Sequence, residues 1–169
     1  MCGFDAGTTS VSDSIVALRT FPRRWRAAVA VVGDDDGDLL TRRSSPDVWS
    51  ALEYAAHTRD TIAVNGWAMA KSLTEDHPVL EWPGGDEAEI PASVAPDIAT
   101  ALDELAANCE RVAAKAERTD AGDWHRKATL RGGRDEEVDA LWFLRHCVHE
   151  GSHHLRDVQQ VLQTVLRAR

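Results

Sequence analysis

The sequence lacks any apolar run near the ~18 residues that a membrane-spanning helix requires. The N-terminal residues Met1–Asp5 also lack the basic head and apolar stretch of a secretory signal. Together these absences predict a cytoplasmic protein with no membrane partner. No internal repeat or proline-rich linker divides the 169 residues, so the length predicts a single domain over residues 1–169.

Positive charge and paired cysteines are also scarce. The formal net charge is −9 and the isoelectric point is near 5.2, whereas nucleic acid binding needs a basic surface that releases counterions. We therefore expect no nucleic acid partner. The three cysteines, Cys2, Cys109 and Cys147, show no CxxC spacing, which favours reduced thiols over a disulfide framework.

Alternation of the kind seen in strands is almost absent, but helical periodicity is strong. It predicts an all-α protein with four helices, the first broken before Pro22, and a long loop over Glu75–Pro91 that contains Pro78 and Pro83. A loop of that length can run the length of a bundle, so the second and third helices can be parallel. The predicted helices are Ser12–Val32, Ser45–Thr74, Ala92–Arg118 and Asp135–Leu166.

Histidines gather in the last predicted helix, where four of the seven lie within nine residues. His149 and His153 are four residues apart and therefore share a helix face, which is the spacing of a bidentate metal clamp. His57 in the second helix is flanked by Glu53 and Asp60 on one face. If the three imidazoles meet, they leave positions open for water or substrate, as catalytic zinc sites do.

Two metal motifs overlap this region and do not fit it. The segment His149–His153 matches HExxH, but no glutamate follows it and the extended peptidase form fails at Arg156 and Gln159. The ExxH spacing of Glu150 and His153 requires a second ExxH in a di-iron bundle, and the chain has none. We therefore expect neither a zinc peptidase nor a di-iron protein.

Three segments together resemble the DinB/YfiT-like superfamily: Trp49–Asp60, Asp123-Trp124 and Leu144–Asp157. The form is similar to actinobacterial members related to the N-terminal domain of mycothiol-dependent maleylpyruvate isomerase, and Cys2–Asp5 fits that group. The resemblance implies a four-helix bundle of up-down-down-up order. It also implies a divalent metal, zinc or nickel, held by His57, His149 and His153.

The resemblance implies less about the reaction, because the superfamily includes thiol-dependent S-transferases, isomerases and metal-dependent hydrolases. The isomerase's additional C-terminal domain is missing from this sequence, so we do not expect maleylpyruvate isomerisation. We expect an enzyme that acts on a small molecule, with a metal-bound thiol such as mycothiol, or a metal-bound water, as nucleophile. The alternatives are a non-catalytic, stress-related dimeric metal-binding protein and a polar cluster without metal.

Other residues near the predicted ligands are candidates for supporting roles in the site. Glu150 is the candidate proton acceptor for a water nucleophile. Three carboxylates one helical turn from a ligand could fix the orientation of the imidazoles, and three tryptophans could wall a pocket. A homodimer is also expected, because the last helix has an apolar seam on one face and histidines on another. One of these faces can line the site while the other packs against a second subunit. The carboxylates are Glu53, Asp60 and Asp157, and the tryptophans are Trp49, Trp67 and Trp142.

Overall fold

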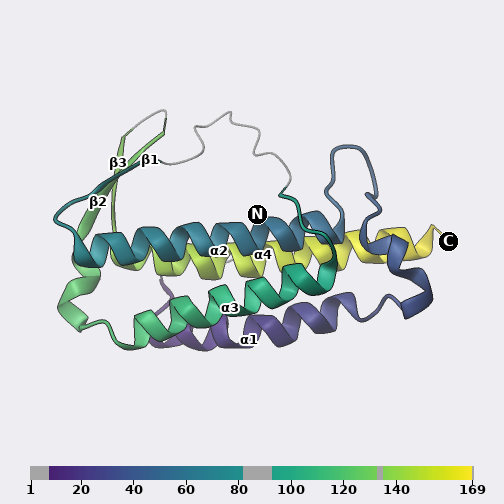
Figure 1. Cartoon of the computed structure of the whole chain (residues 1–169), viewed down its shortest axis with the longest axis horizontal. Coiled ribbons are helices and arrows are strands. Elements are labelled where there is room, and N and C mark those ends of the chain that lie inside the picture. The colour runs from purple at the N-terminus through teal and green to yellow at the C-terminus, as the bar shows by residue number, and fades with distance from the viewer. Residues whose placement is uncertain (1–7, 82–92, 133–134, 169) are drawn as a thin grey trace.

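The fold is that of a four-helix bundle, seen in a computed structural model that describes residues 8–81, 93–132 and 135–168 (Figure 1). The predicted all-α class is confirmed. The segment Cys2–Asp5, and most of the predicted loop Glu75–Pro91, lie outside the described residues. The four long helices are α1 (Val11–Val29), α2 (Ala51–Thr74), α3 (Ile98–Glu117) and α4 (Ala140–Arg167).

The predicted up-down-down-up order is confirmed. In Figure 1, α1 and α4 run in one direction along the bundle, and α2 and α3 run in the other. Extensive contacts join α2 to α4, α2 to α3, α1 to α3 and α1 to α4. The order therefore places α2 directly against α4, the two helices that carry the candidate site.

The prediction that the second helix begins at Ser45 was wrong, since α2 begins at Ala51. The Ser50 hydroxyl accepts from the Glu53 amide at 3.2 Å, and the Glu53 carboxylate accepts from the Ser50 amide at 2.8 Å. This reciprocal capping box satisfies two amides at once. It defines the helix start better than the serine and proline at Ser45-Pro46, where Ser45 instead bridges to Val48.

The predicted break before Pro22 was also wrong, because α1 continues through this proline. Proline removes one backbone hydrogen bond and normally kinks a helix. Here the same face buries Leu18, Phe21 and Trp25 on both sides of the proline, and this packing holds the helix together. The acidic run that follows begins a 3₁₀ helix, η2 (Asp34–Leu40).

A small sheet was missed by the sequence analysis. β1 (Val79–Glu81) pairs in parallel with β2 (Lys127–Arg131), which pairs antiparallel with β3 (Glu136–Asp139). Strands of three to five residues are too short for alternation to stand out from a loop.

Strand pairing and capping also move two predicted helix starts. Asp139 ends β3 and caps α4, so α4 begins at Ala140 instead of Asp135. Asp97, which follows Pro96, caps α3, so α3 begins at Ile98 instead of Ala92. The residue before a proline disfavours helical geometry, which accounts for the late start of α3. A further 3₁₀ helix, η3 (Ala121–His125), precedes β2.

The two faces of α4 have different surroundings. Its apolar seam, which includes Leu144, Val148 and Leu155, is buried in the core. On the same side, the Trp25 indole of α1 donates to the Gly151 carbonyl at 3.3 Å. The histidines therefore lie on the other side of α4, toward α2 and solvent. Cys109 and Cys147 are free and buried, and burial raises the pKa of both thiols, that of Cys109 to about 12.

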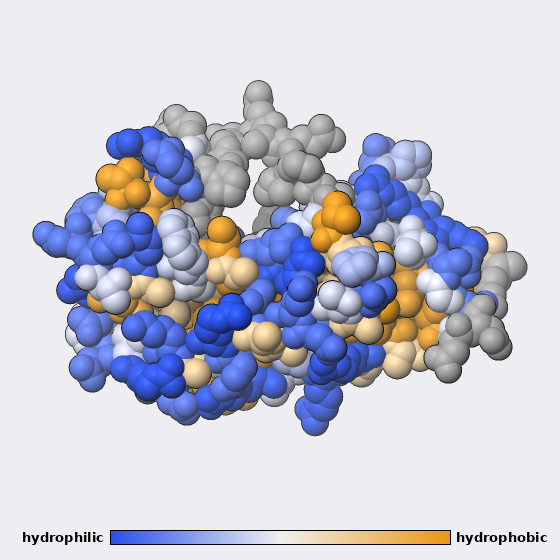
Figure 2. Space-filling view, viewed as in Figure 1, coloured by the Kyte–Doolittle hydropathy of each residue, from blue (hydrophilic) through white to orange (hydrophobic). Residues whose placement is uncertain are grey.

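The visible surface is mostly hydrophilic, with apolar side chains gathered near the C-terminal end of α4 (Figure 2). A groove there lies between α1 and α4 and is lined by Val31, Leu162 and Leu166. Among the described residues, no helix has the length and hydropathy to cross a membrane. The predicted homodimer stays a prediction.

Candidate metal centre

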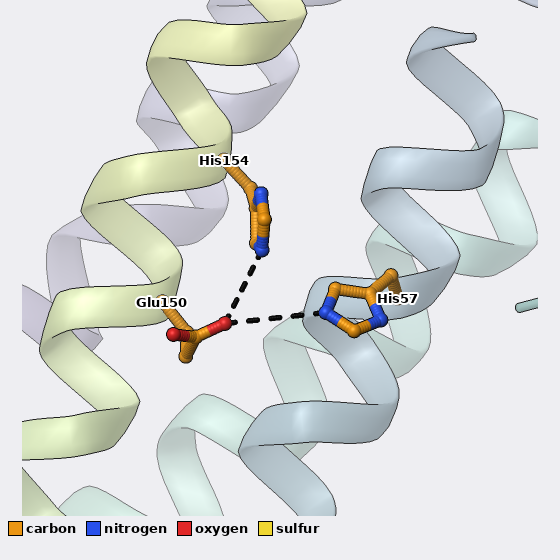
Figure 3. Close-up of side chains that lie close together, drawn as sticks. All are labelled: His57, Glu150 and His154. Atoms are coloured by element: carbon orange, nitrogen blue, oxygen red, sulfur yellow. Dashed lines mark ion pairs between the residues drawn. The ribbon is translucent and has the colours of Figure 1, made fainter. Parts of the chain in front are cut away.

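One histidine of α2 meets a glutamate and a histidine of α4 in the space between these helices. Figure 3 shows His57, Glu150 and His154 pointing toward one another. Glu150 and His154 are four residues apart, so both project from the same face of α4. The capping box at Ser50 fixes the start of α2, and His57 follows two helical turns later. We call these three residues the inner group.

The inner group has the spacing of a metal site. His154 Nε2 lies 3.2 Å from Glu150 Oε2, and His57 Nε2 lies 4.0 Å from the same oxygen. The two imidazole rings meet edge to face with centroids 4.9 Å apart. One ligand atom from each residue lies within 4.8 Å of the others. Two imidazoles and one carboxylate form a donor set that zinc and other divalent transition metals accept.

The Glu150 carboxylate lies among four imidazoles. His146 and His149 approach its other oxygen, Oε1, at 3.6 and 3.8 Å. Burial alone would raise the pKa of Glu150, but the hydrogen bond from His154 and the nearby histidines lower it to about 2. The carboxylate is therefore ionised and able to ligate an ion at neutral pH.

The two histidines of the inner group differ in their protonation. Burial, followed by the nearby charge of His154, lowers the pKa of His57, which keeps its lone pair available. Burial also acts to lower the pKa of His154, but hydrogen bonds to Glu150 and Asp157 outweigh it and raise that pKa. Asp157 Oδ2 lies 2.9 Å from His154 Nδ1. A carboxylate on Nδ1 fixes the tautomer in which Nε2 faces the inner group.

The predicted pair His149 and His153 does not join His57. Their side chains are 31% and 41% exposed, whereas those of Glu150 and His154 are 15% and 12% exposed. In the part of the chain that the structure describes, His57, His149 and His153 do not form a group within 4.8 Å. Glu150 and His154 have the same i, i+4 spacing one residue further along α4, and it is this pair that lies close to His57.

Glu53 and Asp60, predicted to orient imidazoles, are engaged elsewhere. Glu53 caps α2 and forms an ion pair with Arg43 at 2.5 Å. Asp60 forms an ion pair with Arg59 at 2.7 Å, and its side chain is 49% exposed. Of the three predicted carboxylates, Asp157 is hydrogen-bonded to a histidine of the inner group, and that histidine is His154 instead of the predicted His153.

The three predicted pocket tryptophans lie in three different places. The Trp49 ring packs on His57 with centroids 4.8 Å apart and so walls the inner group. Trp67 is 50% exposed and lies in a groove between α2 and α3 beside Lys71. Trp142 stacks on His146 at 4.6 Å and lines a hollow beside β3. Tyr54, which the sequence analysis did not select, packs on His154 at 5.5 Å.

The role of Asp157 can be tested by substitution. We expect Asp157→Asn to lower the affinity for zinc about ten- to hundredfold, the usual effect of removing a carboxylate that orients a metal-binding histidine. Asp60→Asn is the matched control, since Asp60 pairs with Arg59, and it should change the affinity less than about threefold. Competition with a chromophoric chelator measures both values. Equal effects of the two substitutions would contradict the assignment.

Comparisons with known proteins show the family and the fold. A family model described as the DinB superfamily matches residues 18–158. A solved structure of YfiT from Bacillus subtilis, described as a probable metal-dependent hydrolase with an unusual four-helix bundle topology, is similar with a TM-score of 0.76. The similarity covers 92% of this chain and 87% of that chain at 19% sequence identity. A comparison with curated proteins gives no match.

Proposed function

Because the chain belongs to the DinB superfamily, we propose that it is a metal-dependent enzyme whose ion is held by His57, Glu150 and His154. The observation that carries this proposal is the convergence of these three side chains from α2 and α4. The donor set is therefore two histidines and a glutamate, in place of the three histidines predicted from the sequence. The small-molecule substrate stays a prediction.

The chemistry of the donors supports a zinc or nickel ion. The inner group offers an ionised carboxylate and a neutral His57 imidazole, and Asp157 orients the second imidazole. Three protein ligands are the number found at catalytic zinc sites. When bound there, such an ion would lower the pKa of a coordinated water or thiol, which supplies a nucleophile near neutral pH.

We propose hydrolysis of a small molecule as the reaction, in keeping with the description of YfiT. The predicted proton acceptor, Glu150, has a pKa of about 2, which makes it a poor base at neutral pH. His146 fits the role better. Burial, ahead of all other causes, lowers the pKa of His146 and keeps its imidazole neutral, and Nε2 lies 3.6 Å from Glu150 Oε1.

Transfer or isomerisation through a thiol such as mycothiol is the second candidate. The observation that favours it is the place of Glu150 in the inner group, 3.2 Å from His154 Nε2, because a carboxylate that ligates the ion is not free to activate a water. A thiol requires no proton acceptor from the chain, because coordination to a metal deprotonates it outright. The two candidates share the inner group and differ in the nucleophile.

An activity screen of untagged protein tests this function. Zinc- or nickel-loaded protein should hydrolyse members of a panel of small esters and amides, or conjugate electrophiles to a thiol such as mycothiol. His154→Ala should lower that activity more than about a hundredfold, because a ligand is lost. His125→Ala is the control, since His125 is exposed and lies near Asp139, outside the inner group. Metal binding with no activity that depends on His154 would instead support a non-catalytic metal-binding protein.

Zinc affinity should fall as the pH decreases, and the fall should begin above pH 6.5. The ion requires a neutral His154, but hydrogen bonds to Glu150 and Asp157 raise the pKa of this residue from 6.5 despite its burial. Protons therefore compete at a higher pH than for an ordinary histidine. The lowered pKa of His57 adds competition only below 6.5.

The measurement is the apparent dissociation constant for zinc between about pH 5.5 and pH 8, with a chelator of known affinity at each pH. In Asp157→Asn the fall should begin at a lower pH, since the carboxylate charge that helps to raise the pKa of His154 is removed. An affinity that stays constant from about pH 8 to pH 6 contradicts ligation by His154.

A further inference from the structure

A second cluster of side chains that could hold a metal ion lies on α4, beside the inner group. It consists of His153, His154 and Asp157, which we call the outer group, and its ligand atoms lie within 4.8 Å of one another. His153 Nε2 is 3.6 Å from Asp157 Oδ2. Two ligands on one tetrahedral ion, with bonds of about 2.1 Å, are separated by about 3.4 Å. The histidine and the carboxylate are thus spaced as if to share a cation.

The inner and outer groups share one imidazole. His154 turns Nε2 toward Glu150 at 3.2 Å and Nδ1 toward Asp157 at 2.9 Å. A neutral imidazole has a single lone pair, on one of its two nitrogens. When Nε2 ligates an ion in the inner group, Nδ1 carries the proton and donates to Asp157. His154 can therefore complete only one of the two groups at a time.

We infer that His153 and Asp157 form a second cation site, which takes His154 Nδ1 as a third ligand only when the inner group is empty. This inference rests on the proposed function for the coupling between the sites, but not for the outer site itself. With the inner group filled, the outer ion has two protein ligands, and a free oxygen lone pair of Asp157 can bind it while the carboxylate still accepts from His154. The second ion therefore binds more weakly than the first.

The coupling has a consequence for the inner group. Coupling between two binding sites is reciprocal, so an ion in the outer group weakens the hold on the inner ion by the same factor. Asp157 couples the two groups, because its negative charge interacts with both the outer ion and the Nδ1 proton of His154. Excess zinc should therefore loosen the inner ion, and the chain would respond to the concentration of free metal.

Zinc titrations of metal-stripped, untagged protein test this inference. The wild-type chain should bind two equivalents, the second at least about tenfold more weakly. His153→Ala should keep the tight equivalent and lose the weak one. The His153 side chain is 41% exposed, so this substitution should leave the fold intact. His57→Ala should lose the tight equivalent, and the outer site should then bind about tenfold more tightly, since His154 Nδ1 becomes available.

The control is His125→Ala, because the exposed His125 forms another histidine–carboxylate pair with the half-buried Asp139, with Nδ1 and Oδ2 3.9 Å apart. It should retain both equivalents. A wild-type chain that binds one equivalent, kept in His153→Ala and lost in His57→Ala, overturns the outer site and leaves the proposed function standing. A tight equivalent kept in His57→Ala and lost in His153→Ala would instead overturn the proposed function and retain the outer site. Loss of the weak equivalent in His125→Ala would also reject the outer site, since a pair without a third ligand would then be responsible.

Discussion

Replacing Glu150 by Gln is expected to lower the affinity for zinc more than about a hundredfold, whereas His149→Ala should change it less than about threefold. Removal of a residue that merely orients a ligand already costs about ten- to hundredfold, and loss of a charged ligand exceeds this. Glu150 Oε2 is the atom that both His57 and His154 approach, at 4.0 and 3.2 Å. His149 lies outside the inner group.

These two variants distinguish between the proposed donor set, His57, Glu150 and His154, and the one predicted from the sequence. Gln keeps the shape of Glu and removes only its charge and one acceptor oxygen, so the packing between α2 and α4 is retained. Competition titrations with a chromophoric chelator give both affinities, and melting temperatures of the metal-free variants report whether each is folded. If His149→Ala loses zinc and Glu150→Gln keeps it, the inner group is not the metal site.

The sequence predicts the four helices and the helices that carry the site, because these depend on patterns that extend over many residues. The order of the helices is implied by the family resemblance, and the long second loop only permits it. The sequence is less successful at helix ends. The capping box at Ser50 and the short pairing of β3 with β2 are local competitions that a periodic pattern does not resolve. At Pro22 the local signal was misleading. Buried packing on both sides of this proline outweighs its tendency to break a helix.

The candidate site shows why an i, i+4 pattern leaves the ligands undetermined. His149 with His153, and Glu150 with His154, both have this spacing, and the two pairs differ by about 100° around the helix. The rotation of α4 is set by its buried seam, which includes Leu144 and Val148. At about 100° per residue, Glu150 and His154 lie about 40° closer to this seam. Glu150 and His154 are therefore the more buried pair. The sequence contained this signal in the positions of the apolar seam residues along the last helix.

The seam also contains Gly151, directly after Glu150, where α4 packs against Phe21 of α1. A Cβ atom added to Gly151 would lie 2.8 and 2.9 Å from two carbons of the Phe21 ring and closer still to a third. Phe21 is fully buried, so its ring has little room to move. Alanine here must push the helices apart or rotate α4, and either change moves Glu150 relative to His57.

We therefore expect Gly151→Ala to destabilise the protein by about 2 kcal/mol. Alanine in place of glycine inside a helix stabilises it by ~1 kcal/mol, but forcing a methyl group into a packed core costs about 3 kcal/mol in the tighter cases. The melting temperature should fall by roughly 4–8 °C for a domain of this size, and zinc should bind more weakly.

Gly122→Ala is the control, since nothing lies within 4 Å of its added Cβ. Adding Phe21→Leu should restore part of the loss, because a smaller side chain makes room for the methyl group, and this coupling is measurable in a double-mutant cycle. A Gly151→Ala variant that melts at a higher temperature than the wild type would show that α1 and α4 can separate without cost, and that the rotation of α4 does not depend on this contact.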